Sequence, residues 1–402
     1  MQEVHINGPV NIVRLEGNVG GVNKVIHLFM DFHMQVNQQT ECDNVRNIDV
    51  DKFLVKLFDE NKGKIYDLFV ENNPLYPYRF PDLTKLKGRY LFEQTAKLMN
   101  KAMRFDKDKV VQSGEFDNVR FHYADIREYT TRKTDKVFNE IRNLVSLCER
   151  NYRVTYGDIV VVVDGLKLIV ANMIWLYNTI YKEVPKEYRK SKVIFTNNQE
   201  ILASYSEEDY RGIGENIVFK IMDVYDNVGV KEVMNKIMHE DVHENFQSFF
   251  EKMNDMIDYL NKLEKTFEPY KGKNIFTVLF LRTTGIYNYG LDLSKLFDLY
   301  DMLYEELVGG VSAKMMDVYT LRRMLDKKYM TNIIAYTGAA HSVNYVRYLV
   351  KYFGFRVVGA AYVDRDIGQA MDIIKKSKSS DELHKLFFTP IFKQCSIAKN
   401  LF

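Results

Sequence analysis

Short, continuous runs of apolar residues recur along the chain between long amphipathic stretches, and this alternation limits the fold more than any other feature. Continuous apolarity over a few residues is typical of strands that are covered on both faces. The runs cover residues 23–30, 118–123, 159–163, 192–196, 275–281, 332–337 and 356–362. Helical periodicity covers 50–72, 84–105, 131–153, 166–182, 215–240, 242–265, 294–308, 314–328, 340–353 and 366–387. The alternation predicts an α/β protein with a mainly parallel central sheet, flanked by helices and carrying helical insertions.

The chain has few of the residues that usually mark linkers between domains. It contains 7 prolines in 402 residues and no stretch rich in Gly, Ser and Pro. We therefore expect a single α/β body over residues 1–402. Residues 43–113 fall between two predicted strands and are expected to form a helical insertion or cap. Residues 206–270 are expected to form a second helical block.

Charge and cysteine content restrict the partners and the compartment. The formal net charge is +2 with both signs interspersed, so no basic patch for nucleic acid is expected. The 3 cysteines are far apart in sequence, which favours a reducing compartment and disfavours a disulfide framework. The apolar window 159–177 is interrupted by polar residues, and the first residues lack a signal-peptide pattern. We expect a cytoplasmic protein without a membrane span.

The segment "HEDVH" at 239–243 has the letter pattern of zinc proteases. In such a protease, the histidines at i and i+4 bind one Zn²⁺ and the glutamate acts as general base. Here His239 and His243 lie beside the apolar stripe of a predicted helix, and Asp241 adds charge where such helices are normally apolar. A half-exposed helix edge is therefore the favoured interpretation, and a zinc protease stays as an alternative.

Polar clusters at the ends of predicted strands give a stronger signal. In open α/β sheets, ligands bind at the carboxyl ends of the strands. The run 23–30 leads directly into Asp31 and His33, which point the same way if the strand continues that far. The alternative is a capping aspartate and a surface histidine at the end of a strand.

The second strand end is the segment "NVRFHYADIR". His122 ends the strand, and Asp125 and Arg127 follow at once. An aspartate in this position can orient a histidine that acts as a base or metal ligand. An ion pair between Asp125 and Arg127 that fixes the loop is the alternative.

The third strand end is "NIIAYTGAAHSVNYVRYLVKYFGFRVV", residues 332–358. The small residues Gly338, Ala339 and Ala340 allow another group to approach the backbone closely. His341 then falls in the first turn of the predicted helix, where the helix dipole favours the neutral imidazole. A histidine that occupies this turn without a chemical role is the alternative.

This order of strand, G-x-x-H, helix and glycine resembles the second G-x-x-H motif of the TraB/Tiki group, which is related to erythromycin-esterase-like and ChaN-like proteins. The resemblance implies a pseudo-symmetric α/β fold, and either a metal-dependent hydrolase or protease, a haem-binding protein or a protein without known activity. The family's first G-x-x-H corresponds here to Met30–His33, with Met30 in place of the glycine. The family also uses a glutamate from a middle segment, for which Glu41 or Glu200 are candidates. Separately, the Lys-, Asn-, Tyr- and Phe-rich texture is similar to that of proteins from large DNA viruses of protists.

Together these features predict a pocket lined by Asp31, His33, His122, Asp125 and His341. It would belong to a hydrolase acting on a small molecule or a peptide, with Arg127 as a further candidate. Metal assistance would come from Zn or Mn held by His33, His341 and Asp31. The alternative is a non-catalytic interaction or virion-associated protein on the same fold, either a homo-oligomer or a partner of other virion components, located in the host cytoplasm or the virion.

Overall fold

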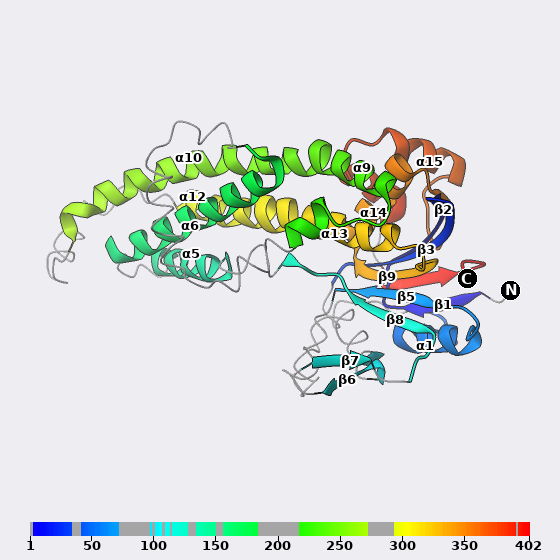
Figure 1. Cartoon of the computed structure of the whole chain (residues 1–402). Coiled ribbons are helices and arrows are strands. Elements are labelled where there is room, and N and C mark those ends of the chain that lie inside the picture. The colour runs from blue at the N-terminus through cyan, green and yellow to red at the C-terminus, as the bar shows by residue number, and fades with distance from the viewer. Residues whose placement is uncertain are drawn as a thin grey trace. The chain divides into compact units, whose positions relative to one another are not determined.

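The computed structural model describes residues 3–33, 42–71, 97–98, 101–106, 109–112, 115–127, 134–149, 156–183, 217–271, 293–390 and 393–402 (Figure 1). Sequence features suggested one body, whereas the chain groups into two compact units. The first unit combines Met1–Asp125, Tyr225–Asn235 and Met316–Phe402, and the second combines Ile126–Val224 and Lys236–Met315. The first unit is therefore built from both ends of the chain.

A six-stranded sheet forms the centre of the first unit. Its strands are β2 (Asn11–Val19), β3 (Val22–Asp31), β5 (Tyr66–Val70), β8 (Val119–Tyr123), β9 (Asn332–Gly338) and β10 (Arg356–Ala360). They lie in the order β10-β2-β3-β9-β5-β8. The neighbours β3–β9, β9–β5 and β5–β8 are parallel, and β2 is antiparallel to both β3 and β10. The predicted α/β class with a mainly parallel sheet and flanking helices is confirmed.

Helices cover both faces of this sheet (Figure 1). Helix α1 (Val50–Glu60) buries Phe53, Leu54 and Phe58 in one apolar cluster with residues of β3, β5 and β9. Helix α14 (Ala339–Phe353) packs against β2, β3 and β9. It ends at Gly354, whose φ of 68° is the left-handed conformation that glycine adopts at little cost. The chain then turns into β10, as the glycine in the sequence predicted.

Among the described residues, the first unit also contains α15 (Ile367–Lys376), α16 (His384–Phe387) and most of α13 (Ala313–Asp326). Helix α9 (Val228–Ile237) begins in this unit. The second unit contains α5 (Thr134–Glu149), α6 (Tyr156–Tyr181), α10 (His243–Phe267) and α12 (Leu293–Met302). Two π-helical stretches, Met238–Val242 and Leu303–Ser312, interrupt its helices.

The described residues of the segment 43–113 include strands as well as helices. The predicted helix 50–72 ends at Glu60 in α1, and the following "YDLFV" is β5, an internal strand of the central sheet. Strands β6 (Met103–Asp106) and β7 (Lys109–Gln112) then pair as a separate antiparallel ribbon. The helical assignment was therefore wrong for Tyr66–Val70, which supply part of the core sheet. Residues 217–271 of the expected helical block 206–270 are largely helical.

The run of valines at 159–163 was wrongly predicted as a strand and lies within α6. Helix α6 is buried on most of its surface and packs against α5 and α10. Its length and mean hydropathy of 2.1 would also suit a membrane span, with 61% of the apolar window buried inside the structure. The predicted strands 192–196 and 275–281 lie outside the described residues.

A small sheet joins the two ends of the chain. Strand β1 (Val4–Asn7) pairs antiparallel with β11 (Cys395–Ala398) and parallel with β4 (Ile48–Asp49). Cys42 and Cys395 form a disulfide beside this sheet, across a sequence separation of 353 residues. The expectation that the cysteines are unpaired was therefore wrong for these two. Their wide spacing in the sequence concealed a contact that the fold creates.

Candidate functional site

The carboxyl ends of three neighbouring parallel strands lie at one edge of the central sheet. Asp31 at the end of β3 is in register with Gly338 at the end of β9. Val70 at the end of β5 is in register with Tyr336 on β9, so Glu71 follows at the same edge. The carboxylates and imidazoles gathered here are called the acid–imidazole cluster below, and its members are Asp31, His33, Glu71, Asp317 and His341.

His33 reaches the cluster because its backbone turns back on itself. Its φ of 54° is in the left-handed region, which is uncommon for a residue other than glycine. The backbone N–H of His33 donates to Asp31 Oδ1 at 2.5 Å, and the ring Nδ1 lies 3.2 Å from the same oxygen. Asp31 Oδ2 accepts from the Tyr336 hydroxyl at 3.1 Å. Asp31 therefore fixes both the backbone and the ring of His33.

Glu71 lies between the two imidazoles. Its Oε2 accepts from His33 Nε2 at 3.1 Å, and its Oε1 accepts from the backbone N–H of Gly338 at 2.8 Å. His341 Nε2 is 3.7 Å from Oε1, too long for a hydrogen bond to that oxygen. A Cβ atom on Gly338 would lie 2.9 Å from His33 Nε2. The close approach expected at this glycine is confirmed.

His341 is oriented by a second aspartate. Its Nδ1 donates to Asp317 Oδ1 at 2.6 Å, and Asn344 Nδ2 donates to Asp317 Oδ2 at 2.6 Å. Helix α13 carries Asp317, whereas α14 carries His341 and Asn344. The result is a continuous row of carboxylate, imidazole, carboxylate, imidazole and carboxylate.

The cluster is buried and negatively charged. The side chains of Asp31, Glu71 and Asp317 are at most 1% exposed, whereas that of His33 is 27% exposed. Burial alone would lower the pKa of His33, but its hydrogen bonds to Asp31 and Glu71 outweigh burial and raise that pKa to about 9. His33 therefore carries a positive charge at neutral pH. Burial together with the charges of Asp317 and Glu71 raises the pKa of the nearby Tyr345 well above its usual value.

Of the residues predicted from sequence, Asp31, His33 and His341 meet in this cluster. His122 belongs to a different network on β5 and β8. Its Nε2 donates to Asp67 Oδ1 at 2.8 Å, and its Nδ1 accepts from Arg323 at 2.9 Å. Arg120 binds Asp67 through two hydrogen bonds of 2.7 and 2.6 Å. Burial first, and then Arg323, lower the pKa of His122. It is a neutral residue that ties the strands together.

Asp125 and Arg127 lie where the chain leaves the central sheet. Both are half-buried after the end of β8, and neither takes part in the contacts described above that build the cluster. Asp125 is the last residue of its stretch of the first unit, and Arg127 belongs to the second unit. The sequence predicted that Asp125 would orient His122, whereas in the structure the His122 ring is held by Asp67.

The "HEDVH" segment forms a π-helical turn followed by the start of α10. His239 and His243 both pack their rings against Tyr181, and His243 Nε2 shares a hydrogen bond of 2.8 Å with the Tyr177 hydroxyl. Asp241 is buried and pairs with Lys314 at 3.0 Å. Among the described residues, this segment is not part of a three-residue group with metal-ligand spacing. These contacts fit the interpretation of the segment as the edge of a helix and not as a zinc site.

Metal-ligand spacing occurs elsewhere. Within the described ranges, one group of at least three His, Cys, Asp or Glu residues has ligand atoms that all lie within 4.8 Å of one another. Its members are His5, Cys42 and Cys395. The predicted set of His33, His341 and Asp31 does not form such a group. Asp31 instead holds the far side of the His33 ring.

Sequence reasoning missed two members of the cluster. Glu71 directly follows the apolar run "LFV" at 68–70, a signal that the predicted helix 50–72 obscured. Asp317 lies within a helix, two turns before the end of α13, where no strand-end rule applies. The candidates for the middle glutamate, Glu41 and Glu200, lie outside the described residues. Met30, at the family's glycine position, is a fully buried strand residue, and the turn comes after it.

Comparisons with known proteins match almost the whole chain. The model of the "Family of unknown function (DUF5847)" matches residues 4–401. "Uncharacterized protein R706" of Acanthamoeba polyphaga mimivirus is 32% identical, covering 97% of this chain and 94% of that protein. "Uncharacterized protein R161" of the same virus is 32% identical, covering 99% and 97%.

These relatives support the expected origin in a large DNA virus. No solved structure matches the chain. Since the family model spans nearly every residue and both viral relatives align over nearly their full length, the chain belongs to the family of unknown function DUF5847.

Proposed function

We propose that the protein is a hydrolase and that the acid–imidazole cluster is its catalytic centre. The observation that carries the proposal is the row of five groups in which two imidazoles face one buried carboxylate. Each imidazole is held at its other nitrogen by its own aspartate. A base oriented by a third group is the arrangement that activates a nucleophile in acid–base catalysis.

His341 has the geometry of the general base. Asp317 accepts the Nδ1 proton, which fixes the tautomer whose Nε2 can take a proton from water. The same aspartate stabilises the imidazolium that forms. Glu71 already accepts from Gly338 and His33, so it positions these groups rather than acting as the base.

His33 has the properties of an electrostatic stabiliser. Its raised pKa of about 9 keeps it charged at neutral pH, and it is the most exposed member of the cluster. A fixed positive charge in a buried site stabilises the oxyanion that develops when water attacks a carbonyl or phosphoryl group. Substrate would therefore approach from the side of His33.

A divalent metal is the second candidate feature of this centre. Two imidazoles and one carboxylate are a common donor set for Zn²⁺ or Mn²⁺. Here His33, His341 and Glu71 would supply it once the two rings move closer, since their ligand atoms do not all lie within 4.8 Å of one another. Asp31 and Asp317 hold the far nitrogens of both rings, as carboxylates do behind metal-binding histidines. Such an ion would polarise a bound water. Its binding requires His33 to lose a proton, so affinity would rise with pH.

The resemblance to the TraB/Tiki group supports the same assignment. That group combines two G-x-x-H segments with a glutamate from a middle segment. His33, Gly338–His341 and Glu71 would be the corresponding residues here. The substrate would be a small molecule or a peptide, encountered in the host cytoplasm or the virion.

The test is hydrolysis of a fluorogenic panel of esters, amides, peptides and phosphoesters by the full chain, with chelator, Zn²⁺ or Mn²⁺. Glu71→Gln and His341→Ala should each lower the rate by about a hundredfold or more. His243→Ala is the matched control and should retain the rate.

Activity that survives in both cluster variants would refute the proposal. So would the absence of turnover across the panel, which would favour the non-catalytic, virion-associated alternative. Loss of activity in His243→Ala alone would instead support the "HEDVH" protease.

A further inference from the structure

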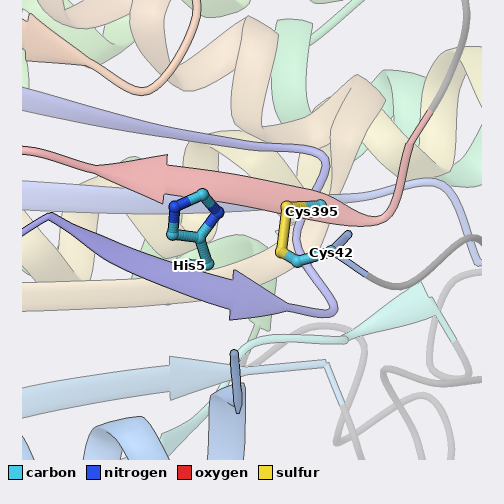
Figure 2. Close-up of side chains that lie close together, drawn as sticks. All are labelled: His5, Cys42 and Cys395. Carbon is cyan, nitrogen blue, oxygen red and sulfur yellow. A yellow bond between two sulfur atoms is a disulfide. The ribbon is translucent and has the colours of Figure 1, made fainter. Parts of the chain in front are cut away.

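A second group of chemically competent side chains lies away from the acid–imidazole cluster, beside the small sheet of the first unit. Figure 2 shows the imidazole of His5 alongside the Cys42–Cys395 disulfide. One nitrogen of His5 and the two sulfurs all lie within 4.8 Å of one another. A histidine and two cysteines at this spacing are the ligands of many zinc sites.

The fold, and not the disulfide alone, keeps the two cysteines together. Cys395 starts β11 and is in register with Asn7 on β1. The Asn7 side chain accepts from the backbone N–H of Cys42 at 3.0 Å, and Asn47 donates to the Cys42 carbonyl at 3.0 Å. The Cα atoms of the cysteines are 5.0 Å apart. We therefore expect the two thiols to remain adjacent after reduction.

His5 is oriented for binding through one nitrogen. Its Nε2 donates to Glu3 Oε1 at 3.0 Å, so Nδ1 is the nitrogen that can serve as a ligand. A carboxylate on the far nitrogen of a histidine fixes the ring and makes it a better ligand. His5 lies on β1, two residues before Asn7, so the same strand supports the imidazole and Cys42.

The group can be reached from solvent. A crevice of about 830 Å³ is lined by all three side chains, with Asp43 and Lys393 at its edge. Asp43 and Lys393 pair at 2.9 Å, so they add no net charge. A small reductant and a metal ion could both enter here.

We propose that His5, Cys42 and Cys395 form a thiolate–imidazole zinc site when the disulfide is reduced. Two electrons from the reductant break the S–S bond, and two protons give two cysteine thiols. Two thiols supply both the electrons and the protons and end as a disulfide, whereas a phosphine supplies the electrons, water supplies the protons and the oxygen, and a phosphine oxide forms. Zn²⁺ then binds both sulfurs and the imidazole, and the two thiol protons are released to solvent. A water molecule completes four-coordination.

The sulfur positions suit this exchange. Tetrahedral zinc with Zn–S bonds of about 2.3 Å places two sulfurs roughly 3.8 Å apart. Rotation of the side chains can give this separation while the backbone keeps its hydrogen bonds to Asn7 and Asn47. Disulfides are favoured in oxidising compartments and thiols in reducing ones. The site would therefore fasten β11 to the segment around Cys42 in both environments, by a covalent bond in one and by a metal in the other.

The test uses the full chain, reduced with a phosphine under anaerobic conditions, desalted and titrated with Co²⁺ and then Zn²⁺. Reduced wild type should show thiolate-to-cobalt charge-transfer absorption at one equivalent, and Zn²⁺ should displace the cobalt. The oxidised protein should show neither. Cys395→Ser should lose the absorption, and His5→Ala, which keeps both sulfurs, should bind cobalt at least about tenfold more weakly.

Two controls isolate the site. Cys148→Ser removes the third cysteine, and His341→Ala disables the acid–imidazole cluster; both should keep the absorption. Loss of the signal in Cys148→Ser would overturn the proposal, as would equal metal binding by the oxidised protein or full affinity in His5→Ala. None of these outcomes depends on whether the cluster hydrolyses anything.

Discussion

Replacing Glu71 by Gln should lower the pKa of His33, because Glu71 is one of the two carboxylates that raise it. In the native cluster, burial opposes the charge on His33, but hydrogen bonds to Asp31 and Glu71 raise its pKa to about 9. A carboxylate at this distance raises a histidine pKa by about 1 to 3, so removing one should leave the His33 pKa between about 6 and 8. At pH 8 the wild-type ring would then be mainly charged, and the ring of the variant largely neutral.

The assay is NMR titration of ¹³C-labelled histidine, with the His33 signal assigned by its loss in His33→Gln. Asp67→Asn is the matched control, because it removes a buried carboxylate from the neighbouring network around His122. It should lower the pKa of His122 and leave that of His33 near 9. A His33 that titrates near 6.5 in wild type, or equally in wild type and Glu71→Gln, would refute the pairing with Glu71.

The same pKa predicts how stability depends on pH. His33 has a folded pKa of about 9 against an ordinary value of 6.5, which corresponds to about 3 kcal/mol of stabilisation as an upper bound. Because the folded pKa is raised, this contribution is complete below pH 6.5 and is lost as the pH rises through 9. The difference in unfolding free energy between wild type and His33→Gln should shrink accordingly.

Three further substitutions test separate parts of the structure. Gly338→Ala places a Cβ 2.9 Å from His33 Nε2, so it should displace the His33 signal and cost about 1 to 3 kcal/mol of stability in denaturant unfolding. Asp317→Asn should release the tautomer of His341, which ¹⁵N shifts of its ring would report. Lys24→Met removes three hydrogen bonds to backbone carbonyls and should cost about 2 to 4 kcal/mol. Since burial lowers the Lys24 pKa to about 8, wild type should gain stability between pH 8 and 10.5, and the variant should lose that gain.

The sheet could be predicted where a strand and the turn after it each have a recognisable pattern in adjacent residues. Strand β9 and helix α14 follow from an apolar run, small residues and a glycine that ends the helix. The valines of 159–163 show the opposite case, because a short apolar run does not distinguish a buried strand from part of a buried helix. There the contacts of α6 with the preceding α5 and with the more distant α10 decide, and a window of a few residues contains neither helix. Strand β5 was missed because it is short and follows α1 closely.

The candidate site could be predicted only in part, for the same reason. Asp31, His33 and His341 lie at strand ends that the sequence reveals. Glu71 and Asp317 gain their roles from register and helix packing, which set distances between residues separated by tens to hundreds of positions. The disulfide is the extreme case, since its cysteines come from the two ends of the chain. Such contacts belong to the fold as a whole, and no local pattern encodes them.

The composition of the acid–imidazole cluster bears on the proposed hydrolase, because buried ionic groups contribute little to stability. The cluster holds three buried carboxyl groups and two imidazoles, so its acidic groups outnumber its basic ones. Buried ionic networks of this kind are seldom more stable than apolar packing of the same volume, and the left-handed backbone of His33 adds a further cost. An excess of acidic groups beside a half-exposed, charged imidazole favours binding of a cation or a proton. That preference suits the metal-assisted or acid–base hydrolase proposed above.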